Sequence, residues 1–134
     1  FVHRAGLVHG AVLPPHVLVH PIDHGARLVD WCYAVAIGER VPAKSRAWAA
    51  LYAPEIAARE PATPATDIYM AAKCALRLLG TADAPHALRK FLATCIVAKP
   101  SRRPDDAWAL HEELDALLLR LVGKPTYRPL TLDE

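Results

Sequence analysis

Two short β-prone runs lie near the start of the chain, and the first of them alternates with a period of two. Residues 16–20 read HVLVH and residues 26–30 contain ARLVD, while the segment between them holds Asp23 and Gly25. Alternation with a period of two is typical of a half-buried strand. Asp and Gly both tolerate the positive φ angles of tight turns. The pattern therefore predicts a small β-hairpin over these residues.

The strongest helical pattern follows Pro64, in the sequence ATDIYMAAKCALRLLG. Thr66 is a candidate N-cap, Asp67 suits the first turn, and Gly80 is a typical stop signal. Apolar residues occupy nearly every face of this segment. Because a helix that is apolar all round is normally buried all round, we predict a central helix enclosed by the rest of the domain.

Two further helices are predicted nearer the C-terminus. The first spans residues 83–97, and the second is expected to open at Pro104 and to end at Gly123. The apolar residues of the second recur at helical spacing in one stripe: Ala107, Leu110, Leu114, Leu117, Leu118 and Leu121. We expect this stripe and Trp108 to belong to the core, the alternative for the stripe being a partner surface.

The remaining segments connect these elements. Residues 31–52 show weak periodicity, which favours a long surface loop with a short helical turn near its end. Another short helix is predicted to begin at Pro54. The fold class is therefore mainly α with a small hairpin. We predict one helical domain over residues 1–123 and an extended C-terminal tail over residues 124–134.

Composition narrows the class of protein. The chain has 134 residues, of which 53% are hydrophobic and 22% charged, as in an ordinary globular domain. Its net charge of +2 gives no reason to expect nucleic acid or an anionic membrane as a partner. No apolar run is long enough to span a bilayer and no signal peptide is visible. We therefore expect a cytoplasmic location, and a first residue other than Met favours a piece of a longer protein.

The cysteine thiols and the histidine imidazoles are candidate metal ligands. Cys32, Cys74 and Cys95 form no CxxC pair, so we expect buried, reduced thiols. Five of the seven histidines lie within the first 24 residues. On one regular strand, His16 and His20 would be about 13 Å apart at roughly 3.3 Å per residue. One ion cannot bridge that distance, and the spacing matches no zinc motif, so no metal site is expected.

Five motifs, taken in order, resemble those of the C-terminal lobe of protein kinases. The segment HGAVLPPHVLV, which begins at His9, resembles the catalytic loop H-R-D-L-K-P-x-N-[IV]-L-[IV]. LVDWCYA is similar to the metal-binding D-F-G segment, with Asp30 at the aspartate. APE, ending at Glu55, matches the motif that closes the activation segment. TDIYMAA resembles the start of the central helix D-x-W-S-x-G, with Asp67 in place, and SRRP supplies Arg103 before the last helix.

The resemblance fails at the positions that carry the chemistry. Ala11 stands where the family has its proton-accepting aspartate, Leu13 where it has a lysine, and His16 where it has a metal-binding asparagine. The chain contains neither a glycine-rich phosphate loop nor its partner lysine, which belong to an N-lobe absent from this sequence. The segment between Gly80 and Pro85 is also shorter than the resemblance implies. Loss of a general base alone typically lowers a rate by roughly 10² to 10⁴.

The resemblance also implies contacts that stabilise the fold without the replaced catalytic residues. In kinases, the residues at the positions of Glu55 and Arg103 form a buried ion pair. The aspartate at the position of Asp67 accepts hydrogen bonds from the backbone of the loop that is 9–11 here, and His9 holds the geometry of that loop. Trp31, in place of the phenylalanine of D-F-G, would fill space that a nucleotide uses.

The sequence thus predicts a pseudokinase lobe with no catalytic residues and no cofactor. Its function would be that of a protein-interaction or regulatory module within a larger protein. The partner would be another protein, a neighbouring domain of the same chain or a second copy, bound through an apolar face left bare by the missing N-lobe. The alternative is a divergent Ser/Thr kinase-like domain that binds ATP and Mg²⁺ through Asp30 when joined to an N-lobe.

Overall fold

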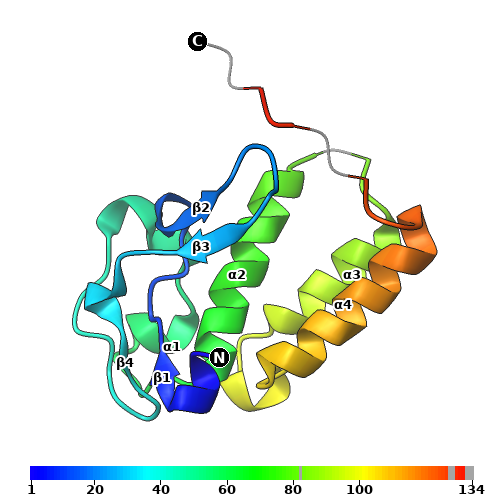
Figure 1. Cartoon of the computed structure of the whole chain (residues 1–134). Coiled ribbons are helices and arrows are strands. Elements are labelled where there is room, and N and C mark those ends of the chain that lie inside the picture. The colour runs from blue at the N-terminus through cyan, green and yellow to red at the C-terminus, as the bar shows by residue number, and fades with distance from the viewer. Residues whose placement is uncertain (82, 127–128, 132–134) are drawn as a thin grey trace.

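The computed structural model of the chain consists of helices and two small antiparallel sheets (Figure 1). The structure describes residues 1–81, 83–126 and 129–131. The helices are α1 (Pro54–Ala57), α2 (Pro64–Leu79), α3 (His86–Cys95) and α4 (Ala107–Val122). The strands are β1 (Leu7–Val8), β2 (Val17–Val19), β3 (Ala26–Leu28) and β4 (Val35–Ala36). Short 3₁₀-helical turns lie at His3–Ala5, Pro14–His16, Trp31–Tyr33, Arg46–Leu51 and Pro100–Arg102. The expectation of a mainly helical chain with a small hairpin is confirmed.

The predicted hairpin is formed by β2 and β3. Val17 pairs with Leu28 and Val19 pairs with Ala26, in an antiparallel register. In the turn, the carboxylate of Asp23 accepts a hydrogen bond of 2.8 Å from the amide of the glycine two residues on. A second pairing, between β1 and β4, was not predicted. Each of its strands has two residues, too few for alternation to be visible in the sequence.

Helix α2 begins earlier than predicted, and its cap is Thr63 rather than Thr66. The side chain of Thr63 accepts from the backbone of Thr66, and the hydroxyl of Thr66 accepts from the backbone of Thr63 at 2.9 Å. This reciprocal arrangement is a capping box, and Pro64 at the first helical position suits it because its φ angle is already helical. Both threonines therefore belong to the same N-terminal cap.

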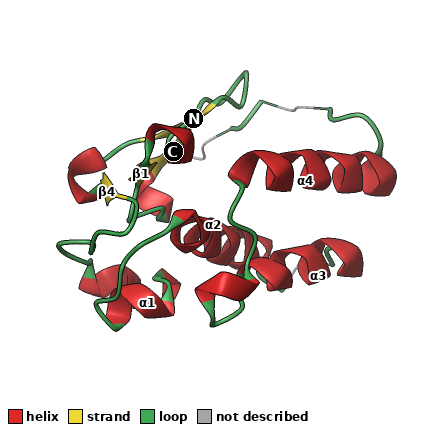
Figure 2. Ribbon diagram, turned by 90° about the horizontal axis from the view of Figure 1, so that it is seen from below, coloured by secondary structure: helices red, strands yellow, loops and turns green. Residues whose placement is uncertain are grey.

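Burial of α2 is uneven along its length, so the prediction of a fully enclosed helix is wrong. Its first part is buried, whereas Leu78 near the C-terminal end is 86% exposed. One buried face joins Met70 and Cys74 to the segment after β1, and another joins Ile68 to α3. Figure 2 shows α2 between the loops around α1 on one side and the pair α3 and α4 on the other. The helix is central, but its last turns reach solvent.

Helix α4 differs from its prediction in both its start and its burial. It begins three residues after Pro104, where the carboxylate of Asp106 accepts from the amides of Trp108 and Ala109 at 2.8 and 3.2 Å. None of the described side chains of α4 is buried, and the predicted core residue Trp108 is 48% exposed. Leu110, in the predicted core stripe, is only half-buried. The stripe packs against α3, and Leu110 also packs against the apolar cluster that includes Ile68 and Ala72 of α2.

Two smaller predictions are also revised. Cys74 and Cys95 are buried free thiols, as expected, but Cys32 is exposed. Residues 127, 128 and 132–134 of the predicted tail lie outside the described part of the chain. Within the described tail, the amide of Leu130 donates to the carbonyl of Pro21, so the tail touches the hairpin turn.

Candidate functional site

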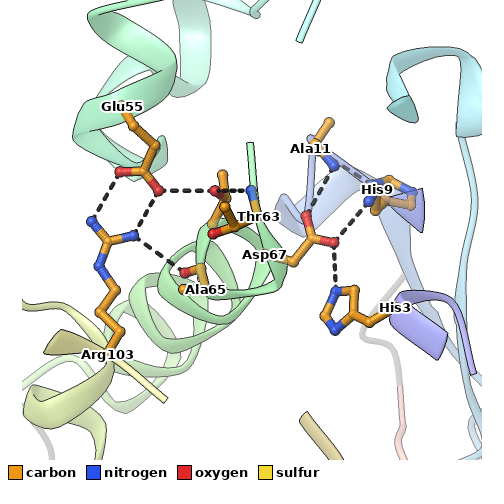
Figure 3. Close-up of polar contacts among 10 residues, drawn as sticks. His3, His9, Ala11, Glu55, Thr63, Ala65, Asp67 and Arg103 are labelled. Atoms are coloured by element: carbon orange, nitrogen blue, oxygen red, sulfur yellow. Dashed lines mark hydrogen bonds and ion pairs between the residues drawn. The ribbon is translucent and has the colours of Figure 1, made fainter. Parts of the chain in front are cut away.

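Asp67 holds the backbone of the loop that follows β1. Its carboxylate accepts hydrogen bonds from the amides of His9 at 2.7 Å and Gly10 at 2.9 Å (Figure 3). Asp67 lies in the first turn of α2 and is 6% exposed. The contact expected between this carboxylate and the 9–11 loop is therefore present. The structure adds His3, whose Nε2 lies 3.0 Å from the same carboxylate.

The shape of this loop also depends on Gly10 and on the ring of His9. Gly10 has a φ angle of +73°, and a Cβ there would lie 2.9 Å from the carbonyl oxygen of Tyr33. The buried ring of His9 accepts from the amide of Ala11 through Nδ1 and faces the carbonyl of Val29 through Nε2, at 3.0 Å. Because a carbonyl oxygen only accepts, Nε2 is the donor. The ring thus ties the loop to the end of the hairpin.

Glu55 and Arg103 form the expected buried ion pair. The two guanidinium nitrogens donate to the two carboxylate oxygens at 2.7 and 2.9 Å, the bidentate geometry that makes such pairs strong (Figure 3). The side chains are 2% and 0% exposed, respectively. The hydroxyl of Thr66 donates to Glu55 at 2.9 Å, so the pair is also connected to the capping box of α2.

The remaining donors of Arg103 are satisfied by main-chain carbonyls. It donates to the carbonyl oxygens of Ala65 at 3.2 Å, of Ala98 at 2.7 Å, and of Val97. Burial by itself would raise the pKa of Glu55. The hydrogen bonds from Arg103, from its own backbone and from the Thr66 hydroxyl, together with the arginine charge, outweigh burial and hold that pKa below its ordinary value. The pair therefore joins α1, α2 and the segment before α4 as a charged unit.

Ala11 and Leu13 occupy the interior of the domain. Both are 0% exposed and belong to one apolar cluster with Met70 of α2. An apolar side chain in that position can neither accept a proton nor carry a positive charge. Sequence reasoning treated these two positions as degenerate catalytic positions, and the structure shows that they contribute to the hydrophobic core.

His16 contacts both the loop and Asp30. Its Nδ1 lies 2.8 Å from the carbonyl oxygen of Ala11, and its Nε2 lies 3.2 Å from the Asp30 carboxylate. The ring is stacked on Tyr33, with centroids 5.7 Å apart. Asp30, the predicted cofactor-binding candidate, has a φ angle of +67°. The sequence placed these residues at separate motif positions and did not predict their contact, which depends on how the hairpin folds back.

Cys32 and Trp31 complete this end of the site. The Cys32 thiol lies 3.4 Å from the second carboxylate oxygen of Asp30. Desolvation, together with the hydrogen bond and charge of Asp30, raises the pKa of this thiol, which disfavours the nucleophilic thiolate. The edge of Trp31 meets the ring of His9 at a centroid distance of 4.7 Å, and its Nε1 donates to the carbonyl of Leu28 at 3.1 Å.

An apolar cleft of about 500 Å³ lies between α2, α3, α4 and the first residues of the chain. The floor includes Ile68, Ala71 and Ala75 of α2, and the opposite wall includes Leu110 and Leu114 of α4. Apolar side chains are exposed elsewhere as well, on and beyond the hairpin: Leu18, Val19, Ile22 and Leu130.

The family models that were scanned contain no match to the chain, and no curated protein matches it. In the ranges that the structure describes, there is no cluster of three or more His, Cys, Asp or Glu side chains able to hold a metal ion. No helix among the described residues has both the length and the apolar character needed to cross a membrane.

Proposed function

We propose that the chain is the C-terminal lobe of a protein kinase-like domain that has lost phosphoryl transfer and acts by binding another protein. One observation carries the proposal. The Asp67 carboxylate accepts hydrogen bonds from the backbone of the loop after β1, and the side chains of Ala11 and Leu13 in that segment are fully buried among apolar residues. The backbone support is that implied by the resemblance, and the catalytic side chains are absent. The ion pair between Glu55 and Arg103 supports the same interpretation.

The missing groups are the ones that phosphoryl transfer needs. That reaction requires a residue to orient the acceptor hydroxyl, metal ions that bridge the phosphates, and positive charge to stabilise the transition state. Ala11 cannot accept a proton and Leu13 carries no charge. Asp30 remains, but its carboxylate already contacts His16 and Cys32. We infer a lobe without enzymatic activity.

The apolar cleft and the exposed hairpin residues support a role in protein binding. A monomeric soluble domain rarely leaves a large apolar patch without a function. The partner is a second protein, a neighbouring domain of the same chain, or another copy of this lobe. The near-neutral charge disfavours nucleic acid and anionic membranes as partners.

Nucleotide binding separates this proposal from the kinase-like alternative. In a thermal unfolding assay of the longest form of the protein that can be expressed, we expect Mg²⁺ and ATP to leave the melting temperature unchanged. Ligand at about 100 times its Kd would instead add roughly 2.7 kcal/mol, which is several degrees in a domain of this size. A rise that disappears in Asp30→Asn would favour the divergent kinase-like domain.

A substitution that places a charge in the cleft tests protein binding. Ala71 is exposed and lines the cleft, whereas Ala116 is exposed on α4 away from it. Sedimentation velocity of the chain alone tests a second copy as the partner, and cross-linking in the source cell tests other proteins. We expect Ala71→Arg to abolish the complex and Ala116→Arg to preserve it. A wild-type chain that is monomeric and forms no cross-linked complex would contradict the proposal.

A further inference from the structure

The metal ions that the kinase resemblance implies do not fit this site. The carboxylate oxygens of Asp30 are approached by His16 Nε2 at 3.2 Å and by Cys32 Sγ at 3.4 Å. The other position that would supply a metal ligand holds an imidazole in place of an amide oxygen. Mg²⁺ prefers oxygen ligands, and imidazole suits softer metals. The donor set here is therefore wrong for Mg²⁺, and His16 already lies against the remaining carboxylate.

The ring of His16 is fixed from several sides. Its Nδ1 faces the carbonyl oxygen of Ala11 at 2.8 Å, and one face stacks on Tyr33. The residue is 9% exposed. Because a carbonyl oxygen only accepts, Nδ1 is the donor to Ala11, and Nε2 is the ring atom that faces the Asp30 carboxylate. The ring lies between the loop at Ala11 and the Asp30 carboxylate.

The backbone around His16 reinforces this arrangement. The amide of Val29 donates to the carbonyl of His16 at 2.9 Å, and the carbonyl of Val29 accepts from the ring of His9. The residue that follows is Asp30, at a positive φ angle that is unusual for a residue other than glycine. These main-chain and side-chain contacts hold the turn that carries the Asp30 carboxylate.

We propose that His16 takes the place of a metal ion in this domain. Its side chain joins the loop at Ala11 to the turn at Asp30 and keeps divalent cations off that carboxylate. His16 is therefore a positioning residue, and the geometry of the site does not depend on a bound metal ion. The inference deepens the proposed function and rests on it, because it explains how the lobe keeps this turn ordered without a cofactor.

The test uses Mn²⁺ as a probe, followed through the paramagnetic broadening of backbone amide signals around Asp30. The wild-type protein, His16→Asn and the double variant His16→Asn with Asp30→Asn are titrated in parallel. We expect His16→Asn to bind Mn²⁺ at this position about tenfold or more tightly than the wild-type protein, because the carboxylate is released and an oxygen ligand is added. The double variant should lose that gain. Equal broadening in wild type and His16→Asn would overturn the inference.

A second measurement covers the case in which His16→Asn does not fold, as judged by circular dichroism. In the wild-type protein, Asp30→Asn should shift the ring nitrogen signals of His16 and leave those of His111, on α4, unchanged. Unchanged His16 signals would show that the contact is absent in solution and would overturn the inference. Failure of the proposed function has a different signature, which is Asp30-dependent binding of Mg²⁺ and ATP by the wild-type protein.

Discussion

At the scale of single residues, the conformation of the loop after β1 follows from one carboxylate and one glycine. Asp67 accepts two main-chain amides, and Gly10 adopts a φ angle that a larger residue would occupy only with a clash. Neither role requires Ala11 or Leu13 to be polar. The conformation of the loop therefore depends on its backbone contacts and not on a polar side chain at either position, as the proposed loss of phosphoryl transfer requires.

Asp67→Asn tests the backbone support. An amide side chain offers one acceptor oxygen and turns an NH₂ group toward a second N–H donor, so the amide of His9 or Gly10 loses its partner. An unsatisfied buried donor costs about 1–3 kcal/mol, and we expect the free energy of unfolding in urea to fall by that amount. The control is Asp115→Asn, whose side chain is 66% exposed. A change of the same size in the control, or no change at Asp67, would contradict the assignment.

Glu55→Gln tests the ion pair. The substitution removes the negative charge and leaves the Arg103 guanidinium buried without a counter-ion. Breaking one side of a buried pair typically costs about 3–5 kcal/mol, measured as the loss in unfolding free energy. The exposed Glu60 provides a matched control as Glu60→Gln, which we expect to remain within about 0.5 kcal/mol of wild type. Equal stability of the two variants would show that the pair does not support the fold.

Because folding lowers the pKa of Glu55, the stability of the protein should depend on pH in a direction that can be stated. Between its folded value and its higher unfolded value, the unfolded chain binds more protons, so stability rises with pH in that interval. The stability contributed by ionised Glu55 is fully present above the ordinary glutamate pKa of about 4.3. It is lost as the pH falls through the lower pKa that Glu55 has in the folded protein. The difference in unfolding free energy between wild type and Glu55→Gln should therefore shrink below that range. A constant difference down to strongly acidic pH would contradict it.

At the scale of elements, periodicity predicted most helices and the hairpin, but not where they begin or how far they are buried. Thr63 and Thr66 both fit an N-cap, and the choice depends on Pro64, which sets the helix start. Trp108 was expected in the core together with the apolar stripe of α4, yet its side chain is 48% exposed. A stripe shows which face is apolar and does not show whether another element covers it.

The site residues were predictable to different extents. Glu55, Asp67 and Arg103 were identified through motifs that resemble a family, because nothing in their spacing shows a contact across 48 or 58 positions. His3 and His16 were missed as contact residues for a similar reason. Each meets its carboxylate only after the chain has folded back on itself. His3 lies in none of the motifs, and His16 was identified as a replaced asparagine, without a contact to Asp30 being predicted.

Thr63→Ala tests the capping box at the start of α2. Loss of an N-cap side chain costs about 1 kcal/mol of protein stability, because a helix amide loses its acceptor. We expect this decrease in chemical unfolding, with Thr81→Ala as an exposed control beyond the other end of the helix. A neutral result at Thr63 would place the start of α2 elsewhere, and the original assignment of the cap to Thr66 would regain support.

At the scale of the whole molecule, α2 organises two halves with different properties. On one side, the Asp67 contact and an apolar cluster fix the loop and the hairpin, and α3 and α4 lie on the other side (Figure 1). The cleft of about 500 Å³ is lined by α2, α3 and α4, by the first residues of the chain, and by His9 and Val12 of the loop. An apolar cleft beside a loop that is held by main-chain hydrogen bonds suits the proposed role of a module that binds a partner. The shape of the domain therefore matters more to the proposed function than any reactive group.

Phosphoryl transfer is the most direct measurement of the central claim. The longest form of the protein that can be expressed is incubated with Mg²⁺, ATP labelled at the γ-phosphate, and general kinase substrates, beside its Asp30→Asn variant. The account predicts no label transfer above background in either protein. Transfer by the wild-type protein that disappears in Asp30→Asn would show a working active site and would contradict it.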